Sequence, residues 1–228
     1  AEHTISNLNN GLFGYISGAT VKNLNLKKVT VNGSGIGSIC HQATNNSTIA
    51  ACLVRDGTLV APSSTGCAGG ICGKADSCTI TDCAIINISI TGECSGGICG
   101  KADSCTITIC LACKVGITAG NKIGGGGGIC GSANSSTITK CVVSNSNLYG
   151  WWNSSNGGNL AGVSWGGDVT DCYSACSYGA VRGGWSSGNK GYFNNERPGA
   201  GAGEGGLSTA EYEQKLREFV DANPEFVK

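Results

Sequence analysis

The chain has few charged residues and no excess of either sign. Of its 228 residues, 15 are Lys or Arg and 15 are Asp or Glu, so the formal net charge is zero. Nucleic-acid binding needs a basic patch, and this balance argues against a nucleic-acid partner. Apolar residues make up 40% of the chain, which together with the low charge argues against intrinsic disorder.

Long hydrophobic runs and catalytic constellations are lacking as well. No apolar run reaches the ~18 residues of a membrane span, so we expect no membrane insertion. The two histidines, His3 and His41, have no neighbouring cluster of acids, bases or metal ligands. The glycine run at 124–128 lacks the Lys-Ser/Thr of a phosphate loop. The sequence therefore predicts no enzyme activity, no catalytic residues, no metal site and no cofactor.

Glycine and cysteine are, by contrast, abundant. The chain holds 39 Gly and 15 Cys. A cysteine density this high is typical of an oxidising compartment and a disulfide framework. We therefore expect an extracellular or cell-surface protein.

A repeat organises most of the chain. Residues 69–83 read Gly-Gly-Ile-Cys-Gly-Lys-Ala-Asp-Ser-Cys-Thr-Ile-Thr-Asp-Cys, and a nearly identical copy begins at Gly96. Looser copies begin near residues 11, 37, 127 and 161. Self-similarity at a fixed period of roughly 20 to 50 residues is typical of solenoids. Residues 4–8 match the second half of a copy, so we expect the chain to open mid-rung, as a fragment or processed product of something longer.

Each copy is predicted to hold three short strands, in the best copy at 70–73, 78–81 and 85–91, with Ile, Val and Thr in the strands and Gly, Asp and Asn at the bends. Equivalent positions are apolar in successive copies, as in the column Ile49, Ile80, Ile107 and Ile138. Stacked ~4.8 Å apart, such columns form one continuous core. The sequence therefore predicts an all-β fold, a parallel β-helix (β-solenoid) of about six to seven rungs over residues 1–197.

The end of the chain has a different composition. Residues 198–207 form a predicted Gly-rich linker. Residues 208–228 are predicted to be an amphipathic α-helix and tail, because Ser208 and Glu211 make a capping box. The apolar stripe of this helix consists of Tyr212, Leu216, Phe219 and Val220.

The repeat resembles a known family. Gly-Gly-Ile-Cys-Gly followed by Ser-Cys-Thr-Ile-Thr-Asp-Cys and a Thr-Gly turn is similar to the GLUG repeat of bacterial secreted and surface proteins. The segment 11–24 is a close match to the same pattern, and the resemblance covers residues 4 to about 175. It implies a β-helical stalk or adhesin segment outside the cell. The chain departs from that family in its cysteine content.

The cysteines occupy columns that are filled together, which suggests that paired positions touch. We expect disulfides within a rung, and bonds between adjacent rungs fit the same occupancy because stacked Cα atoms ~4.8 Å apart are within disulfide range. Cys172 and Cys176 are predicted to pair locally, whereas Cys113 lies near a corner and its Cys-x-x-Cys spacing with Cys110 is a weak metal or redox signal. The expected within-rung pairs are Cys40–Cys52, Cys67–Cys78, Cys72–Cys83, Cys94–Cys105, Cys99–Cys110 and Cys130–Cys141.

Two further features suggest binding surfaces. Thr residues recur as Thr-x-Thr, as at Thr79 and Thr81. They would form a flat ladder that suits either an ordinary exposed β position or ice binding. Twelve of the fourteen aromatic residues follow residue 148. These aromatic residues either cap the end of the solenoid, where the repeat pattern degrades, or stack on sugars. The candidate ligand-binding residues are Trp151, Trp152, Trp165 and Trp185.

The sequence therefore predicts a structural or adhesive β-solenoid rather than an enzyme. The partners we expect are other copies of the same chain, assembled head to tail into a surface fibre, because Ile5 and Leu8 lie behind an open β-edge in the first rung. The alternative is a carbohydrate-binding module that recognises surface glycans.

Overall fold

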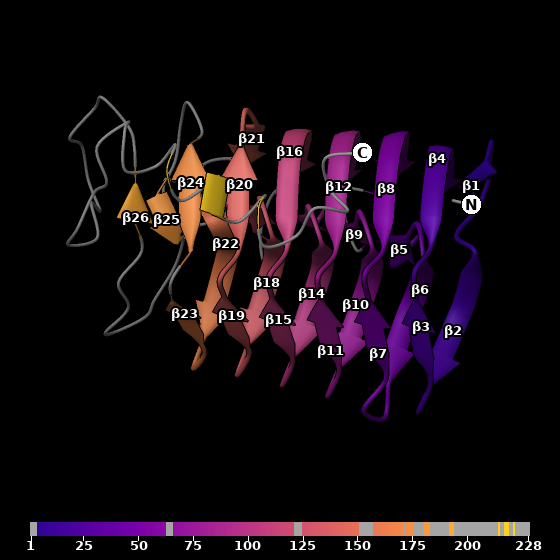
Figure 1. The fold of residues 1–228 in the computed structure, drawn as a ribbon, viewed down its shortest axis with the longest axis horizontal. Coiled ribbons are helices and arrows are strands. Elements are labelled where there is room, and N and C mark those ends of the chain that lie inside the picture. The colour runs from indigo at the N-terminus through magenta and orange to yellow at the C-terminus, as the bar shows by residue number, and fades with distance from the viewer. Residues whose placement is uncertain are drawn as a thin grey trace.

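The structure is a computed structural model, and it describes residues 4–62, 66–120, 125–150, 157–170, 172–175, 180–182 and 192–193, together with four residues near the C-terminus. The described chain winds as a stack of rungs along one long axis, with the N-terminal rung at one end (Figure 1). Each rung contributes strands to three parallel sheets, here called faces A, B and C. The predicted parallel β-solenoid is confirmed.

Face A contains the longest strands. In the described residues it has nine strands: β1 (Thr4–Ser6), β4 (Asn25–Asn32), β8 (Leu53–Val60), β12 (Ala84–Gly92), β16 (Leu111–Ala119), β20 (Val142–Ser144), β21 (Asn147–Gly150), β24 (Tyr173–Ala175) and β26 (Tyr192–Phe193).

In four of its rungs, face B is built from two short strands where the sequence predicted one. Its eleven strands in the described part of the chain are β2 (Phe13–Ser17), β5 (Ile36–Gly37), β6 (Cys40–Thr44), β9 (Cys67–Gly69), β10 (Cys72–Asp76), β13 (Cys94–Gly96), β14 (Cys99–Asp103), β17 (Gly126–Gly127), β18 (Cys130–Asn134), β22 (Gly157–Trp165) and β25 (Ala180–Arg182).

Face C is the shortest and most regular. Five turns of the chain separate its first strand from its last, so the expected six to seven rungs are confirmed only as about five complete turns. Its six described strands are β3 (Thr20–Lys22), β7 (Thr48–Ala50), β11 (Thr79–Thr81), β15 (Thr106–Thr108), β19 (Thr137–Thr139) and β23 (Asp168–Thr170).

The register between rungs follows the sequence repeat. Ile80 pairs with Ile107, and Ile107 pairs with Ile138, each in parallel with the equivalent residue of the next rung. These side chains are fully buried and belong to one core cluster that runs along the solenoid. Because no rung can bury its apolar positions alone, the stacked columns are what hold the fold together.

The split of face B has a steric cause. A Cβ atom at Gly96 would overlap the carbonyl oxygen of Cys99 and lie 2.6 Å from the amide nitrogen of Gly131 in the next rung. The same close approach recurs at Gly69 and Gly127. Only glycine fits where the chain turns this tightly between the two strands. The single strand predicted at 70–73 is therefore replaced by strands at 67–69 and 72–76, and residues 70–71 connect them.

The corners of the solenoid are made by residues in the left-handed conformation. One such residue recurs in each rung at each of three positions, with φ between 47° and 60° for those that are not glycine. Asn and Asp, which tolerate this conformation, occupy many of the sites, and Ser and Lys occupy others. One column falls in the middle of the long face A strands and consists of Asn7, Lys28, Asp56, Asn87, Lys114 and Asn145.

The predicted C-terminal helix falls almost entirely outside the described residues, as does the linker at 198–207. Gln214, Arg217, Glu218 and Asp221 have helical backbone and exposed side chains. Gln214 Nε2 donates a hydrogen bond to Glu218 Oε1 at 3.0 Å, one helical turn away. The helix and tail over 208–228 stay a prediction. In the part of the chain that the structure describes, no helix is both long and apolar enough to cross a membrane.

Candidate binding groove and cysteine columns

A groove crosses several rungs on the outside of face A, and sequence reasoning missed it. It arises because the left-handed residue in each long strand bends the strand, leaving a hollow between two outward columns. Its volume is about 620 Å³, within the range of ligand sites in proteins. The side chains along it come from β4, β8, β12 and β16 and from the loop after β1.

The first column of the groove carries charge and amide groups. It consists of Asn7, Lys28, Asp56, Asn87 and Lys114. Asn87 Nδ2 donates a hydrogen bond to Asp56 Oδ1 at 2.8 Å, so adjacent rungs are linked on the surface. In the described chain, neither lysine has an ion-pair partner. Two lysines against one carboxylate give this surface a net positive charge.

The second column of the groove carries hydroxyl groups. Thr30 pairs in register with Thr58, and Thr58 with Ser89, while Gly116 takes the next position. The three hydroxyl residues are exposed. Between the two columns the residues point inward, as Val29 and Ile88 do in the core. A Cβ at Gly57 would lie 2.8 Å from the carbonyl oxygen of Val29, so glycine keeps the floor shallow there.

The signal for this groove is present in the sequence as a break in alternation. In the third strand of the best repeat, Ile86 and Asn87 are both outward or exposed, and inward Ile85 and Ile88 flank them. Strict alternation would have placed Asn87 in the core. A polar residue at the same position in each copy marks a bend that reverses the alternation.

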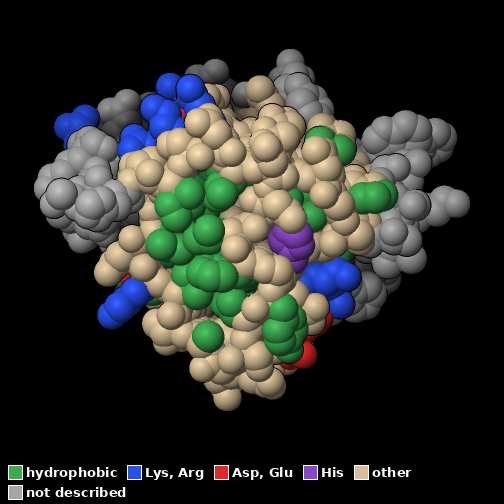
Figure 2. Space-filling model, turned by 90° about the vertical axis from the view of Figure 1, so that its right-hand side faces the viewer, with side chains coloured by type: hydrophobic (Ala, Val, Ile, Leu, Met, Phe, Trp, Pro, Cys, Tyr) green, Lys and Arg blue, Asp and Glu red, His purple; other side chains and the backbone are tan. Residues whose placement is uncertain are grey.

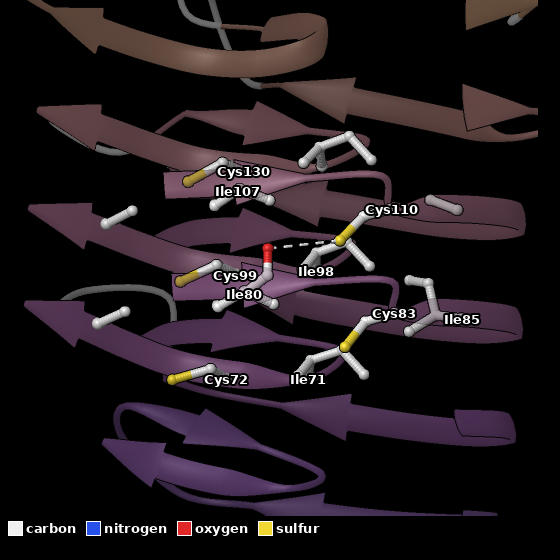
Figure 3. Close-up of a cluster of buried hydrophobic side chains, with 14 of the residues drawn as sticks. Ile71, Cys72, Ile80, Cys83, Ile85, Ile98, Cys99, Ile107, Cys110 and Cys130 are labelled. Carbon is white, nitrogen blue, oxygen red and sulfur yellow. Dashed lines mark hydrogen bonds between the residues drawn. The ribbon is translucent and has the colours of Figure 1, made fainter. Parts of the chain in front are cut away.

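The cysteines form columns that run from rung to rung. Cys72 pairs in register with Cys40 on one side and Cys99 on the other, and Cys99 pairs with Cys130. Figure 3 shows Cys72, Cys99 and Cys130 in one column and Cys83 and Cys110 in another, with isoleucines beside them.

Every sulfur–sulfur contact in the described chain joins adjacent rungs. Cys40 Sγ lies 3.5 Å from Cys72 Sγ, whereas Cys72 and Cys83, the within-rung pair that the sequence favoured, lie in different columns. The structure contains free thiols at all the predicted disulfide positions that it describes. Its contacts therefore follow the rung-to-rung alternative. The physical reason is that side chains in a parallel stack meet the equivalent residue one strand away.

The second column extends through five rungs, from Cys52 to Cys172. Their thiols lie against backbone carbonyl oxygens as well as against each other: Cys110 Sγ is 3.8 Å from Ile80 O (Figure 3) and Cys172 Sγ is 3.6 Å from Ile138 O. Burial and the neighbouring thiol raise the pKa of Cys110 well above its ordinary value. Cys172 continues this column, and Cys176, its predicted partner, lies outside the described residues.

Two shorter cysteine columns, Cys67 with Cys94 and Cys78 with Cys105, differ in the pKa of their thiols. A hydrogen bond from the Cys94 thiol, helped by the nearby Lys74 and Lys101 ammonium groups, lowers the pKa of Cys67 to about 7. Burial raises the pKa of Cys105 to about 12. The thiol of Cys67 is therefore more easily ionised than that of Cys105.

The other sequence candidates are placed as follows. Lys74 and Lys101 stack in register, as do Asp76 and Asp103, and Lys101 Nζ lies 2.9 Å from Asp103 Oδ2. That hydrogen bond raises the pKa of Lys101. Lys74 and Lys101 lie within strands β10 and β14, and Asp76 and Asp103 end these strands. Cys113 is half-buried among outward residues of face A.

The threonine ladder is in register across face C. Thr79 pairs with Thr48 and Thr106, and Thr170 Oγ1 lies 3.2 Å from Thr139 Oγ1. Several members are only half exposed. Of the aromatic candidates, Trp165 ends strand β22, and Trp151, Trp152 and Trp185 lie outside the described residues. His41 is half-buried and its Nε2 is buried without a hydrogen-bond partner, and His3 is outside the described residues.

Comparison with known proteins gives one similarity. Residues 1–55 match the model of the N-terminal region of M26 IgA1-specific metallo-endopeptidases. The match spans about a quarter of the chain and coincides with the first rungs of the solenoid. No curated protein matches the chain. Within the described residues, no three or more His, Cys, Asp or Glu side chains are grouped so that they could hold a metal ion.

Proposed function

We propose that this protein is a non-catalytic structural or adhesive rod that works outside the cell and assembles end to end. The observation that carries the proposal is the N-terminal rung. In the polypeptide of residues 1–228, its strands β1, β2 and β3 stand at the ends of their sheets, where a further rung in the same parallel register would pair with their backbone groups. Figure 2 looks onto this end of the solenoid and shows an apolar patch across it.

The patch is the cross-section of the core. Leu8, Leu12, Val21 and Leu24 are partly buried and pack against the central cluster. Ile5 and Phe13 are 36% and 39% exposed. Open edges over apolar side chains are templates for pairing with another β-structure, and a rung in parallel register would continue all three sheets. A head-to-tail contact of this kind propagates into a filament unless it closes.

The chemistry of the groove supports a role without catalysis. Asp56 is the one carboxylate among the residues that line it, and this carboxylate already accepts a hydrogen bond from Asn87. Hydrolysis of a glycosidic bond by an acid–base pair needs two carboxyl groups on opposite sides of the bond. The groove thus offers binding groups without such a pair.

Disulfides between rungs belong to the same proposal. An extracellular disulfide such as oxidised glutathione would take two electrons from two adjacent thiols, which lose two protons and form one S–S bond. The match to the N-terminal region of a peptidase family and the resemblance to surface repeat proteins are compatible with this location. The stapled rod would resist unfolding because each bond closes a loop of about one rung.

Sedimentation velocity tests the assembly. The wild-type chain is expected to give a larger mean sedimentation coefficient as concentration rises a hundredfold. The double variant Ile5→Lys with Phe13→Lys places two charges on the apolar end and should sediment as a single small species. Val60→Lys is the matched control, since Val60 is 42% exposed on the side of the rod. Equal behaviour of both variants, or a wild type that never associates, would refute the proposal.

A further inference from the structure

The groove on face A has the chemistry of a site for an acidic polysaccharide, and we propose that it binds an extended, uronic-acid-containing sugar chain along the axis of the solenoid. The proposal does not depend on end-to-end assembly. It starts from the repeat of the groove: strands stack ~4.8 Å apart, so each rung presents one set of groups per step. A polymer with one sugar unit per step can meet the same kind of group in each rung.

The lysines at the two ends of the groove favour a negatively charged ligand. Lys28 and Lys114 lie three rungs apart, or roughly 14 Å at the usual strand spacing. Both are exposed and have no ion-pair partner among the described residues. An ammonium group binds a carboxylate through a charge-assisted hydrogen bond. Carboxylates on separate units of one chain could occupy both lysines at once.

The side chains in the middle of the groove determine which uncharged groups the ligand should carry. Between the lysines lie the exposed hydroxyls of Thr58 and Ser89 and the linked side chains of Asp56 and Asn87. Because Asn87 donates to Asp56 through Nδ2, its Oδ1 stays available as an acceptor. These groups suit a partner rich in hydroxyls that both donate and accept hydrogen bonds.

An acidic peptide fits the groove less well. Peptides that lie along a protein surface gain specificity from pockets for alternate side chains or from a free sheet edge. The strands that form this groove are already paired on both sides, β8 with β4 and β12, and β12 with β8 and β16. The inward residues Val29 and Ile88 contribute their backbone to the floor and bury their side chains in the core.

The site is open, so its affinity should be modest and sensitive to salt. Exposed ion pairs contribute ~1 kcal/mol or less each. Removing both lysines should therefore weaken binding by up to about thirtyfold. Raising the salt concentration should weaken binding of the wild type in the same direction.

The substitutions at the two lysines can be chosen to tolerate the left-handed backbone conformation there. Lys28 and Lys114 have φ of 56° and 55°, and Asn occupies the same column at Asn7 and Asn87. The substitutions Lys28→Asn and Lys114→Asn therefore remove charge while keeping a residue that tolerates the conformation. The control is Lys22→Asn with Lys140→Asn, which removes the same charge from exposed positions along face C. Far-UV circular dichroism checks that both double variants fold.

Calorimetric titration with a hexamer of galacturonic acid is the test. We expect binding by the wild type, a loss of about five- to tenfold in the Lys28→Asn, Lys114→Asn variant, and wild-type affinity in the control. Oligoglutamate of the same charge and a neutral glucan hexamer serve as competing ligands. The proposal is wrong if no uronate binding is seen, if both double variants lose equally, or if either competing ligand binds as tightly. Sedimentation of the groove variant should match the wild type, so this test fails independently of the assembly test.

Discussion

The sulfur atoms of Cys40 and Cys72 lie 3.5 Å apart although 32 residues separate them in the chain. They are equivalent residues of adjacent rungs, and Cys72 faces Cys99 in the same way on its other side. In a column of four thiols, two bonds between neighbours use every cysteine. In the column of five that runs from Cys52 to Cys172, one thiol is always left over, and exchange with an adjacent bond can move that thiol along the column.

Peptide mapping of the oxidised protein should therefore find bonds between rungs. We expect a Cys40–Cys72 peptide. A bond that closes a loop of this length should stabilise the fold by ~3–4 kcal/mol. The variant Cys40→Ser should lose that amount in oxidised protein, and most of the loss should disappear in reductant. Cys113→Ser, outside the columns, is the control. A Cys72–Cys83 peptide in its place would contradict the contacts of the structure.

The Cys67–Cys94 pair should oxidise at lower pH than the Cys78–Cys105 pair. The thiolate is the reactive form, and its fraction at Cys67 rises as pH increases through about 7, against an ordinary value of 9.0. The rate of bond formation with oxidised glutathione, followed by mass spectrometry, should therefore rise with a midpoint near pH 7.

Two comparisons make the pH experiment specific. Replacing Lys74 and Lys101 by Gln should move the midpoint upward, because both ammonium groups favour the thiolate. The Cys78–Cys105 pair should stay slow up to pH 9, since burial raises the pKa of Cys105 to about 12. One common pH profile for both pairs would show that local electrostatics do not set their reactivity.

Gly96→Ala should destabilise the fold severely. A Cβ there overlaps the carbonyl of Cys99 and crowds the next rung, so the backbone has to shift. We expect a loss of more than ~2 kcal/mol in denaturant unfolding, with the cost arising from overpacking. Gly14→Ala is the matched control, because nothing lies within 4 Å of a Cβ at that position. Equal stability of the two variants would mean that the glycine column is not required sterically.

The architecture could be predicted because the repeat carries its own register. Aligning the copies places Ile80 over Ile107, and the structure pairs these residues. The tight turn at Gly69 was not foreseen, because a glycine in a repeat gives no indication of how closely the next rung approaches. The number of rungs was harder to predict, because the copies of the repeat lose their similarity toward the C-terminus and can no longer be aligned. The C-terminal helix follows this stretch and has no repeat to align.

The disulfide pairing could not be settled from occupancy. A rung that has a cysteine in one column also has a cysteine in the other column. The two columns are therefore filled together whether the disulfides form within a rung or between adjacent rungs. The direction of the side chains favours bonds between rungs, and Figure 3 shows Cys72 and Cys83 in separate columns. The groove was missed for a related reason: the left-handed residue at Asn87 reverses the alternation, and alternation was the rule used to sort residues inward and outward.

Small-angle X-ray scattering over a dilution series tests the central claim most directly, because it separates growth in length from growth in width. End-to-end assembly predicts that the overall radius of gyration rises with concentration while the cross-sectional radius stays that of one solenoid. The Ile5→Lys, Phe13→Lys variant should keep the overall radius of the monomer throughout. A cross-section that grows with concentration, or an overall radius that does not change over a hundredfold range, would contradict the account.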